Sequence, residues 1–331
     1  MSYGAQIKFG IARQTAGATP VTVATSFHGF ALASEDVGLE KDELVSRNLT
    51  GNFAEGAVYD GVSRVLGTIE FEPTPRNLHA ALAASVFHTP VSVTSASLRT
   101  LTWLPNTVDY DSTYVKAPFT VYKQFSDANT ADQFYDVQFG QLEFNIANGQ
   151  FLKGRLTAVG GKRTAAGVGS AAIAPDLADV GVLYPWNVCS ISIGGTAVGE
   201  YSDITVQLNE NIDALYTVNG TLDPFKFTRT DFRQVTVSGT LYQINRNRLD
   251  DFAAGTQRRL LITLMNTRTA IQSGYFNYMQ IDVPQMKITQ CKPGASGPGE
   301  VQIGFNARAV VDAASAYVIQ FTTITTWIAG F

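Results

Sequence analysis

Histidine and cysteine are the side chains best suited to metal binding or nucleophilic catalysis. The three histidines are His28, His79 and His88, and no two have the His-x-x-x-His or His-x-His spacing that puts two imidazoles on one metal ion. Neither Cys189 nor Cys291 has a histidine nearby, and no Gly-x-Ser-x-Gly motif occurs. We therefore predict no catalytic residue, no metal ligand and no cofactor, and we interpret the chain as a non-enzyme. We expect the histidines to face solvent or cap helices, and the cysteines to be small buried hydrophobes.

A glycine-rich run at residues 160–164 is the nearest approach to a phosphate-binding loop. Gly160, Gly161, Lys162 and Arg163 precede a threonine, but the first glycine of the motif is missing. Arg163 also stands between the lysine and the hydroxyl residue that should follow it directly. We interpret the run as a polar turn that opens a linker.

The densest group of charges is acidic and lies near the N-terminus. It comprises Glu35, Asp36, Glu40, Asp42 and Glu43. One interpretation is a solvated loop beside a strand. The other is a negative wall that repels a nucleic-acid backbone.

Length and composition favour a folded protein that covers much of its surface with partners. The chain has 331 residues, 16% of them charged, against a typical figure of about 25%. Its net charge of −4 argues against wrapping DNA, which requires a cationic excess. The two distant cysteines favour folding in the cytoplasm, and residues 1–13 lack the apolar core of a signal peptide.

The elements that must position any site are mostly strands. Apolar and polar residues alternate with a period of two, and Val301–Arg308 is a clear example. The further predicted strands are Leu98–Trp103, Phe119–Tyr122, Val137–Ile146, Phe151–Ala158, Ile204–Leu208, Arg259–Leu264, Tyr278–Val283 and Tyr317–Thr322. Only Arg76–Ser85 and Arg246–Ala254 have helical spacing. The uncharged stretch Ala313–Phe331 is interpreted as a strand, because threonines interrupt it, and we predict no membrane contact.

An internal repeat organises these elements into two halves. Val65-Leu66-Gly67-Thr68-Ile69 is similar to Val237-Ser238-Gly239-Thr240-Leu241, and a helix candidate follows each. Asp36–Leu39 corresponds to Asp203–Val206, and Gln141–Phe144 corresponds to Gln285–Ile288. The fold class is therefore predicted as mainly β. We expect two tandem β-sandwich or barrel domains, residues 1–179 and 180–331, each with one short flanking helix.

Two irregular segments are candidates for contacts between subunits. The first segment is Pro105–Pro118. The second is Gly160–Asp179, a linker rich in glycine and alanine. Both segments should be mobile in the monomer and become ordered on assembly. The candidate contact residues are Asp109, Tyr110, Asp111, Tyr114, Gly160, Gly161, Lys162 and Arg163.

The chain resembles the major tail tube proteins of siphophages along essentially its whole length. The opening Phe9–Gln14, followed by Gly17–Val21, is similar to the start of that family. The stretch Phe30–Leu39, then Tyr59-Asp60-Gly61 and the strand and helix after it, also follows the family pattern. Tyr135–Lys153 resembles a later part of it.

The resemblance implies a structural virion protein and supplies no catalytic residue. Domains of this family place their strands side by side in rings of six, and the rings stack into a tube. A chain with two domains would close a ring as a trimer with pseudo-sixfold symmetry. The implied partners are the chain itself, the tape measure, tail tip and tail terminator proteins, and DNA that crosses the lumen without specific binding. Assembly in the bacterial host cytoplasm and a place in the virion tail follow.

Two other functions stay open at this point. A receptor- or glycan-binding β-sandwich of the tail tip could use aromatic residues, although Trp103, Trp186 and Trp327 are scattered. Copy number in the virion distinguishes a tip protein from a tube protein, because a tube protein is abundant and a tip protein is rare. A hydrolase on a β-scaffold is the third and weakest alternative.

Overall fold

The structure is a computed structural model of the chain. It describes residues 7–21, 27–46, 58–85, 91–95, 98–124, 131–164, 182–218, 220–242, 246–294 and 301–325. Residues 165–179 of the expected linker, His88 and Trp327 lie outside this part.

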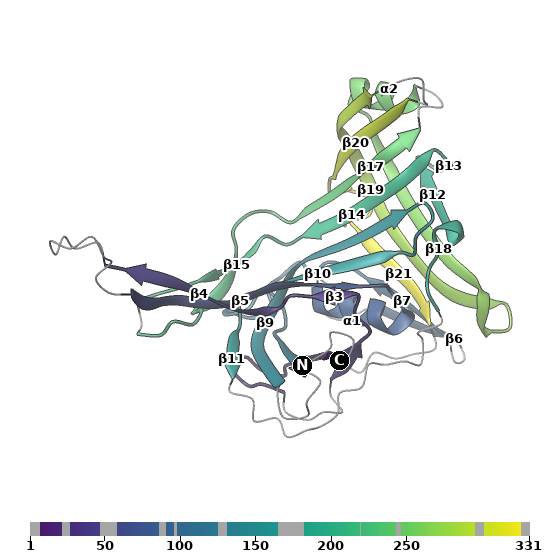
Figure 1. The fold of residues 1–331 in the computed structure, drawn as a ribbon. Coiled ribbons are helices and arrows are strands. Elements are labelled where there is room, and N and C mark those ends of the chain that lie inside the picture. The colour runs from purple at the N-terminus through teal and green to yellow at the C-terminus, as the bar shows by residue number, and fades with distance from the viewer. Residues whose placement is uncertain are drawn as a thin grey trace.

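The fold is mainly β with two short α-helices, as the sequence predicts (Figure 1). The first half contains β1 (Lys8–Arg13), β2 (His28–Phe30), β3 (Ser34–Glu35), β4 (Gly38–Val45), β5 (Val58–Phe71), α1 (Pro75–Ser85), β6 (Val91–Ser95), β7 (Leu98–Trp103), β8 (Phe119–Gln124), β9 (Ala131–Ala147), β10 (Lys153–Val159) and β11 (Lys162–Thr164). The second contains η4 (Trp186–Val188), β12 (Cys189–Ile193), β13 (Thr196–Val198), β14 (Tyr201–Asn209), β15 (Ile212–Leu215), β16 (Lys226–Arg229), β17 (Gln234–Tyr242), α2 (Asn247–Ala254), β18 (Gln257–Gln272), β19 (Tyr275–Gly294), β20 (Gln302–Ala309) and β21 (Gln320–Thr325).

Strand pairing follows one order twice. In the first half β4 pairs with β5, β5 with β10 and β10 with β9. In the second half β14 pairs with β17, β17 with β20 and β20 with β19. The flanking strands repeat as well, since β2–β1–β8–β9 is matched by β13–β12–β18–β19. Each half therefore has the same pairing scheme around a helix that follows β5 or β17.

Two glycines in this scheme have the same environment. A Cβ on Gly67 would lie 2.5 Å from the Cα of Val37 and 2.7 Å from the carbonyl oxygen of Asp36. A Cβ on Gly239 would lie 2.4 Å from the carbonyl oxygen of Asp203. In both places the backbone of the preceding strand passes too close for a side chain, which explains why glycine recurs in the repeat.

The two halves are joined edge to edge in one sheet. Asp203–Asn209 of β14 pairs antiparallel with Gln141–Ala147 of β9, and Val206 lies opposite Phe144. A second junction pairs β21 with β7, which belongs to a β-hairpin found after α1 and not after α2. Backbone hydrogen bonds therefore run across the boundary between the halves at two places.

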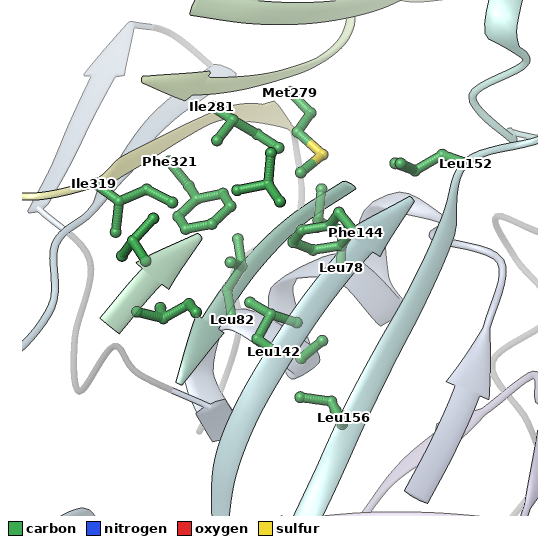
Figure 2. Close-up of a cluster of buried hydrophobic side chains, with 14 of the residues drawn as sticks. Leu78, Leu82, Leu142, Phe144, Leu152, Leu156, Met279, Ile281, Ile319 and Phe321 are labelled. Carbon is green, nitrogen blue, oxygen red and sulfur yellow. The ribbon is translucent and has the colours of Figure 1, made fainter. Parts of the chain in front are cut away.

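The hydrophobic core is continuous across this boundary. Leu78 and Leu82 of α1 lie beside Leu142 and Phe144 of β9, and Phe321 of β21 belongs to the same cluster (Figure 2). Helix α1 is almost wholly buried, whereas in α2 the only buried residues are Arg248 and Asp251. The two helices thus have different surroundings although they follow equivalent strands.

Candidate assembly surfaces

The face of the joined sheet that lies opposite the hydrophobic core carries rows of mostly uncharged polar side chains. In one row Thr68 lies opposite Thr157, Thr157 opposite Gln141, and Gln141 opposite Asn209. A second row runs through Asn145, Thr205, Ser238, Asn306 and Gln290, with Lys153 opposite Asn145 at one end. We call this surface the polar face.

A third row on the polar face contains charges of both signs. Arg155 lies between Glu70 and Glu143 on its two neighbouring strands. The row continues through two uncharged residues to Arg308, which lies opposite Lys287. Because each anion in the first part has a cation as its cross-strand neighbour, the net charge of the row stays small.

The five acidic residues are divided between different environments. Glu35 lies on the core side of β3, where its carboxylate is 2.6 Å from the Nζ of Lys123. Asp36 has the opposite orientation and accepts hydrogen bonds from the backbone N–H and the hydroxyl of Thr68. The backbone hydrogen bond holds the pKa of Asp36 below its usual value. The five acids therefore do not all belong to one exposed wall, because Glu35 forms an ion pair on the core side of the sheet.

The other three acids lie on the hairpin that β4 forms with β5, which projects from the body of the molecule (Figure 1). Glu40 lies opposite Arg64, and Asp42 has an oxygen 3.8 Å from the same guanidinium group. Glu43 lies opposite Asp60, so two like charges face one another there. Leu44 and Tyr59 beside this pair are 60% and 67% exposed. We call residues 38–46 and 58–64 the first arm.

The loop 105–118 contacts the second half of its own chain. The ring of Tyr114 stacks on Phe227 with centroids 5.7 Å apart, and Asp109 accepts a hydrogen bond from Arg229. Asp111 accepts hydrogen bonds from the backbone of residues 113 and 114, which closes a tight turn. Tyr110 has the guanidinium group of Arg13 over its ring at 6.0 Å. The loop therefore joins the two halves of one chain, a role that the sequence did not reveal.

A buried carboxylate completes this contact. Glu210, just after β14, is 0% exposed and lies 3.4 Å from the Nζ of Lys116 in the loop. The guanidinium groups of Arg233 and Arg229 lie 2.5 Å and 3.2 Å from its two oxygens. The ammonium group of Lys116 also donates to the carbonyl oxygen of Ser85, the last residue of α1. One acid thus ties together the loop, the helix and the second half.

The charges in this cluster shift one another's ionisation. Burial alone would raise the pKa of Glu210, but Lys116 and the two arginines outweigh it and hold that pKa below its ordinary value. Burial lowers the pKa of Lys116 to about 7, and Glu210 opposes the shift. The cluster is therefore stable only as a complete set.

The run at residues 160–163 is ordered and forms no phosphate-binding loop. Lys162 and Arg163 belong to β11, which pairs with β9, and Arg163 lies 2.5 Å from Asp132. Gly160 and Gly161 precede the strand with positive φ angles of 69° and 114°. The prediction of an irregular linker is therefore wrong for residues 162–164, which form a strand.

Two histidines are buried, and the expectation that they face solvent is wrong for both. His28 is within hydrogen-bond distance of Asn77, and His79 of α1 lies 3.0 Å from the hydroxyl of Thr323. Burial lowers the pKa of His79 from 6.5 to about 3, with a smaller contribution from His28. The sequence feature that could have predicted the burial of His79 is its position on an otherwise apolar face of the helix.

We expect this histidine to make the protein less stable in mild acid. In the unfolded chain His79 binds a proton below about pH 6.5, but in the folded protein it does so only below about pH 3. The stability of the fold therefore falls as the pH drops through that window. Between pH 7 and pH 5 the loss should be about 2 kcal/mol. Urea unfolding of the wild type and of His79→Gln at both pH values measures it. Equal pH dependence in the two proteins would contradict the assignment.

The two cysteines and two of the tryptophans lie in environments that bear on reactivity and ligand binding. Burial raises the pKa of the Cys189 thiol to about 12 and also raises the pKa of the Cys291 thiol. Both cysteines are therefore poor nucleophiles. Trp103 is buried and donates to Thr323, whereas Trp186 is half-exposed, so these two do not form a glycan platform. In the described part of the chain no three His, Cys, Asp or Glu side chains are placed to hold a metal ion, and no helix is long and apolar enough to cross a membrane.

Comparison with known families agrees with this arrangement. The model of the phage tail tube protein family matches residues 4–309. The chain therefore belongs to the phage tail tube protein family, which is structural and non-enzymatic. Among curated proteins no match was found. Membership implies self-assembly into a tube, contact with other tail proteins and a place in the phage tail.

Proposed function

We propose that the chain is a major tail tube subunit whose trimeric rings stack into a hollow conduit for DNA ejection. Each chain contributes two tandem domains, residues 1–179 and 180–331, so that three chains give pseudo-sixfold symmetry. The observation that carries this is the repeated pairing scheme together with the β9–β14 junction. An edge-to-edge junction between equivalent halves can be continued by further copies until the sheet closes and no edge is left.

The polar face supplies a suitable lining for the lumen. It lies on the side of the sheet away from α1 and the core, and most positions of its first two rows offer hydroxyl and amide groups, with Lys153 at the end of the second row. Asp36 adds negative charge beside its first strands, Glu40 is offset by Arg64 opposite it, and the mixed-charge row contributes little net charge. Such a surface releases few counterions from phosphate and so lets DNA slide past.

Weak DNA binding by assembled tubes is the expected result of this lining. A filter-binding assay with duplex DNA at physiological salt should detect little retention. Replacing Gln141 and Asn209 of the uncharged row by lysine should increase retention at least tenfold, because phosphates then gain cationic partners. Tight binding by the wild type would contradict the assignment of the polar face to the lumen.

Ring formation is tested separately by mass photometry of the purified protein over a range of concentrations. We expect a trimer of the 35.7 kDa chain and larger multiples of it. A protein that stays monomeric at high concentration, or forms rings of another size, would contradict the proposal.

A further inference from the structure

The two arms of the chain differ in how much of their surface is covered. The second arm (residues 210–233, containing β15 and β16) follows β14, whereas the first arm is made of β4 itself and the start of β5. It packs on the first half, where Ile212 and Phe227 form a small core with Tyr114 and Val115. The base of the first arm contacts the second arm, because Ser63 is hydrogen-bonded to Leu222 and Asp223, but Leu44 and Tyr59 further along it are exposed.

Equivalent positions on the two arms make this difference specific. The spacing that relates Asp36 to Asp203 and Leu39 to Val206 also relates Glu43 to Glu210 and Val45 to Ile212. Ile212 is 7% exposed and Val45 is 36% exposed. Glu210 has three cations around it, whereas Glu43 forms no ion pair with any residue that the structure describes.

Two sheet edges are also unpaired. In the described part of the chain β4 pairs with β5 alone, and residues 288–294 of β19 pair with β20 alone. In the first half the equivalent end of β9 carries β14 on its second edge. An open edge next to an exposed apolar arm favours the addition of another strand.

We propose that the first arm of one copy docks on the second half of the next copy, with residues 36–39 at the base of this arm added to residues 288–292 of β19. This rests on the proposed ring and specifies its junction. The register follows from the internal junction: Leu39 lies opposite Ile288, as Val206 lies opposite Phe144. A bulge after Ile288 then places Gly38 opposite Gln290 and Asp36 opposite Lys292.

Charge and geometry both fit a second copy of this chain as the occupant. Asp36 and Lys292 have opposite charge, and Ile288 and Leu39 are apolar. The first residues of β18 cover β19 as far as Lys287, which limits the added strand to the segment beyond it. The addition therefore extends the sheet without displacing a strand.

Disulfide trapping tests the register directly. Gly38→Cys and Gln290→Cys are combined in a chain with both native cysteines replaced by alanine, and assembled rings are oxidised. Position 38 has room for a Cβ, whose nearest contact is 3.9 Å away. We expect covalent trimers on a denaturing gel. The control pairs Gly38→Cys with Gly304→Cys, one strand further along, and should remain monomeric.

The outcome separates this proposal from the function it rests on. If microscopy shows normal rings but oxidation gives no covalent trimer, or the control cross-links equally, the junction is wrong and the tube assignment stands. Glu43→Arg in the native chain gives a second measurement. It should raise the concentration needed for assembly at least tenfold without destabilising the monomer, because it removes the like-charge pair with Asp60, whereas Asp250→Arg on α2 should leave assembly unchanged. Equal assembly of the two variants would also overturn the junction.

Discussion

Glu210→Gln is expected to lower the free energy of unfolding by about 3–5 kcal/mol, because it leaves the buried Lys116 without its anion and removes a partner of Arg233 and Arg229. The loss should carry a pH signature. In the folded wild type the pKa of Lys116 is about 7 and Glu210 holds it up, so loss of that carboxylate should lower the pKa further from its unfolded value. Above the lowered pKa the unfolded chain binds more protons than the folded variant, so the stability of the variant should rise with pH more steeply than that of the wild type.

Urea unfolding at pH 6, 7.5 and 9 measures both effects. Glu143→Gln is the matched control, since Glu143 lies on the polar face opposite Arg155 and should cost less than about 1 kcal/mol. A loss for Glu210→Gln no larger than that of the control would show that the cluster does not hold the two halves together.

Gly67→Ala and Gly239→Ala should each cost about 2–4 kcal/mol. In both cases a Cβ would come within 2.7 Å of backbone atoms of the preceding strand, and backbone cannot give way as the end of a side chain can. At Gly67 the φ of 140° adds strain. Thermal unfolding checks this against Gly304→Ala, where nothing lies within 4 Å of the added Cβ. A loss of stability at either glycine no larger than that of Gly304→Ala would contradict the conclusion that both glycines are crowded by neighbouring backbone.

Local pattern was sufficient to predict much of the fold. Period-two alternation located the strands, and the helices Arg76–Ser85 and Arg246–Ala254 match α1 and α2 to within one residue at their starts. Gly67 and Gly239 were visible as a repeat because backbone crowding permits no other residue there. These features depend on neighbours in sequence or on one adjoining strand.

The contacts between the halves could not be predicted in the same way. Alternation shows which side of a strand is buried, but it does not specify that β14 adds to β9 or that β7 adds to β21. Lys116 and Glu210 are single charges in unremarkable segments, and only the folded chain brings them within 3.4 Å. Glu35 was grouped with its acidic neighbours because sequence proximity hides the change of side between successive strand residues.

Cryo-electron microscopy of the assembled protein tests the central claim most directly. We predict hollow tubes whose cross-section shows six similar β-domains contributed by three chains, with the polar face towards the bore and α2 away from it. A solid filament, a ring with a number of domains other than six, or a bore lined by the face that carries α1 would contradict this account.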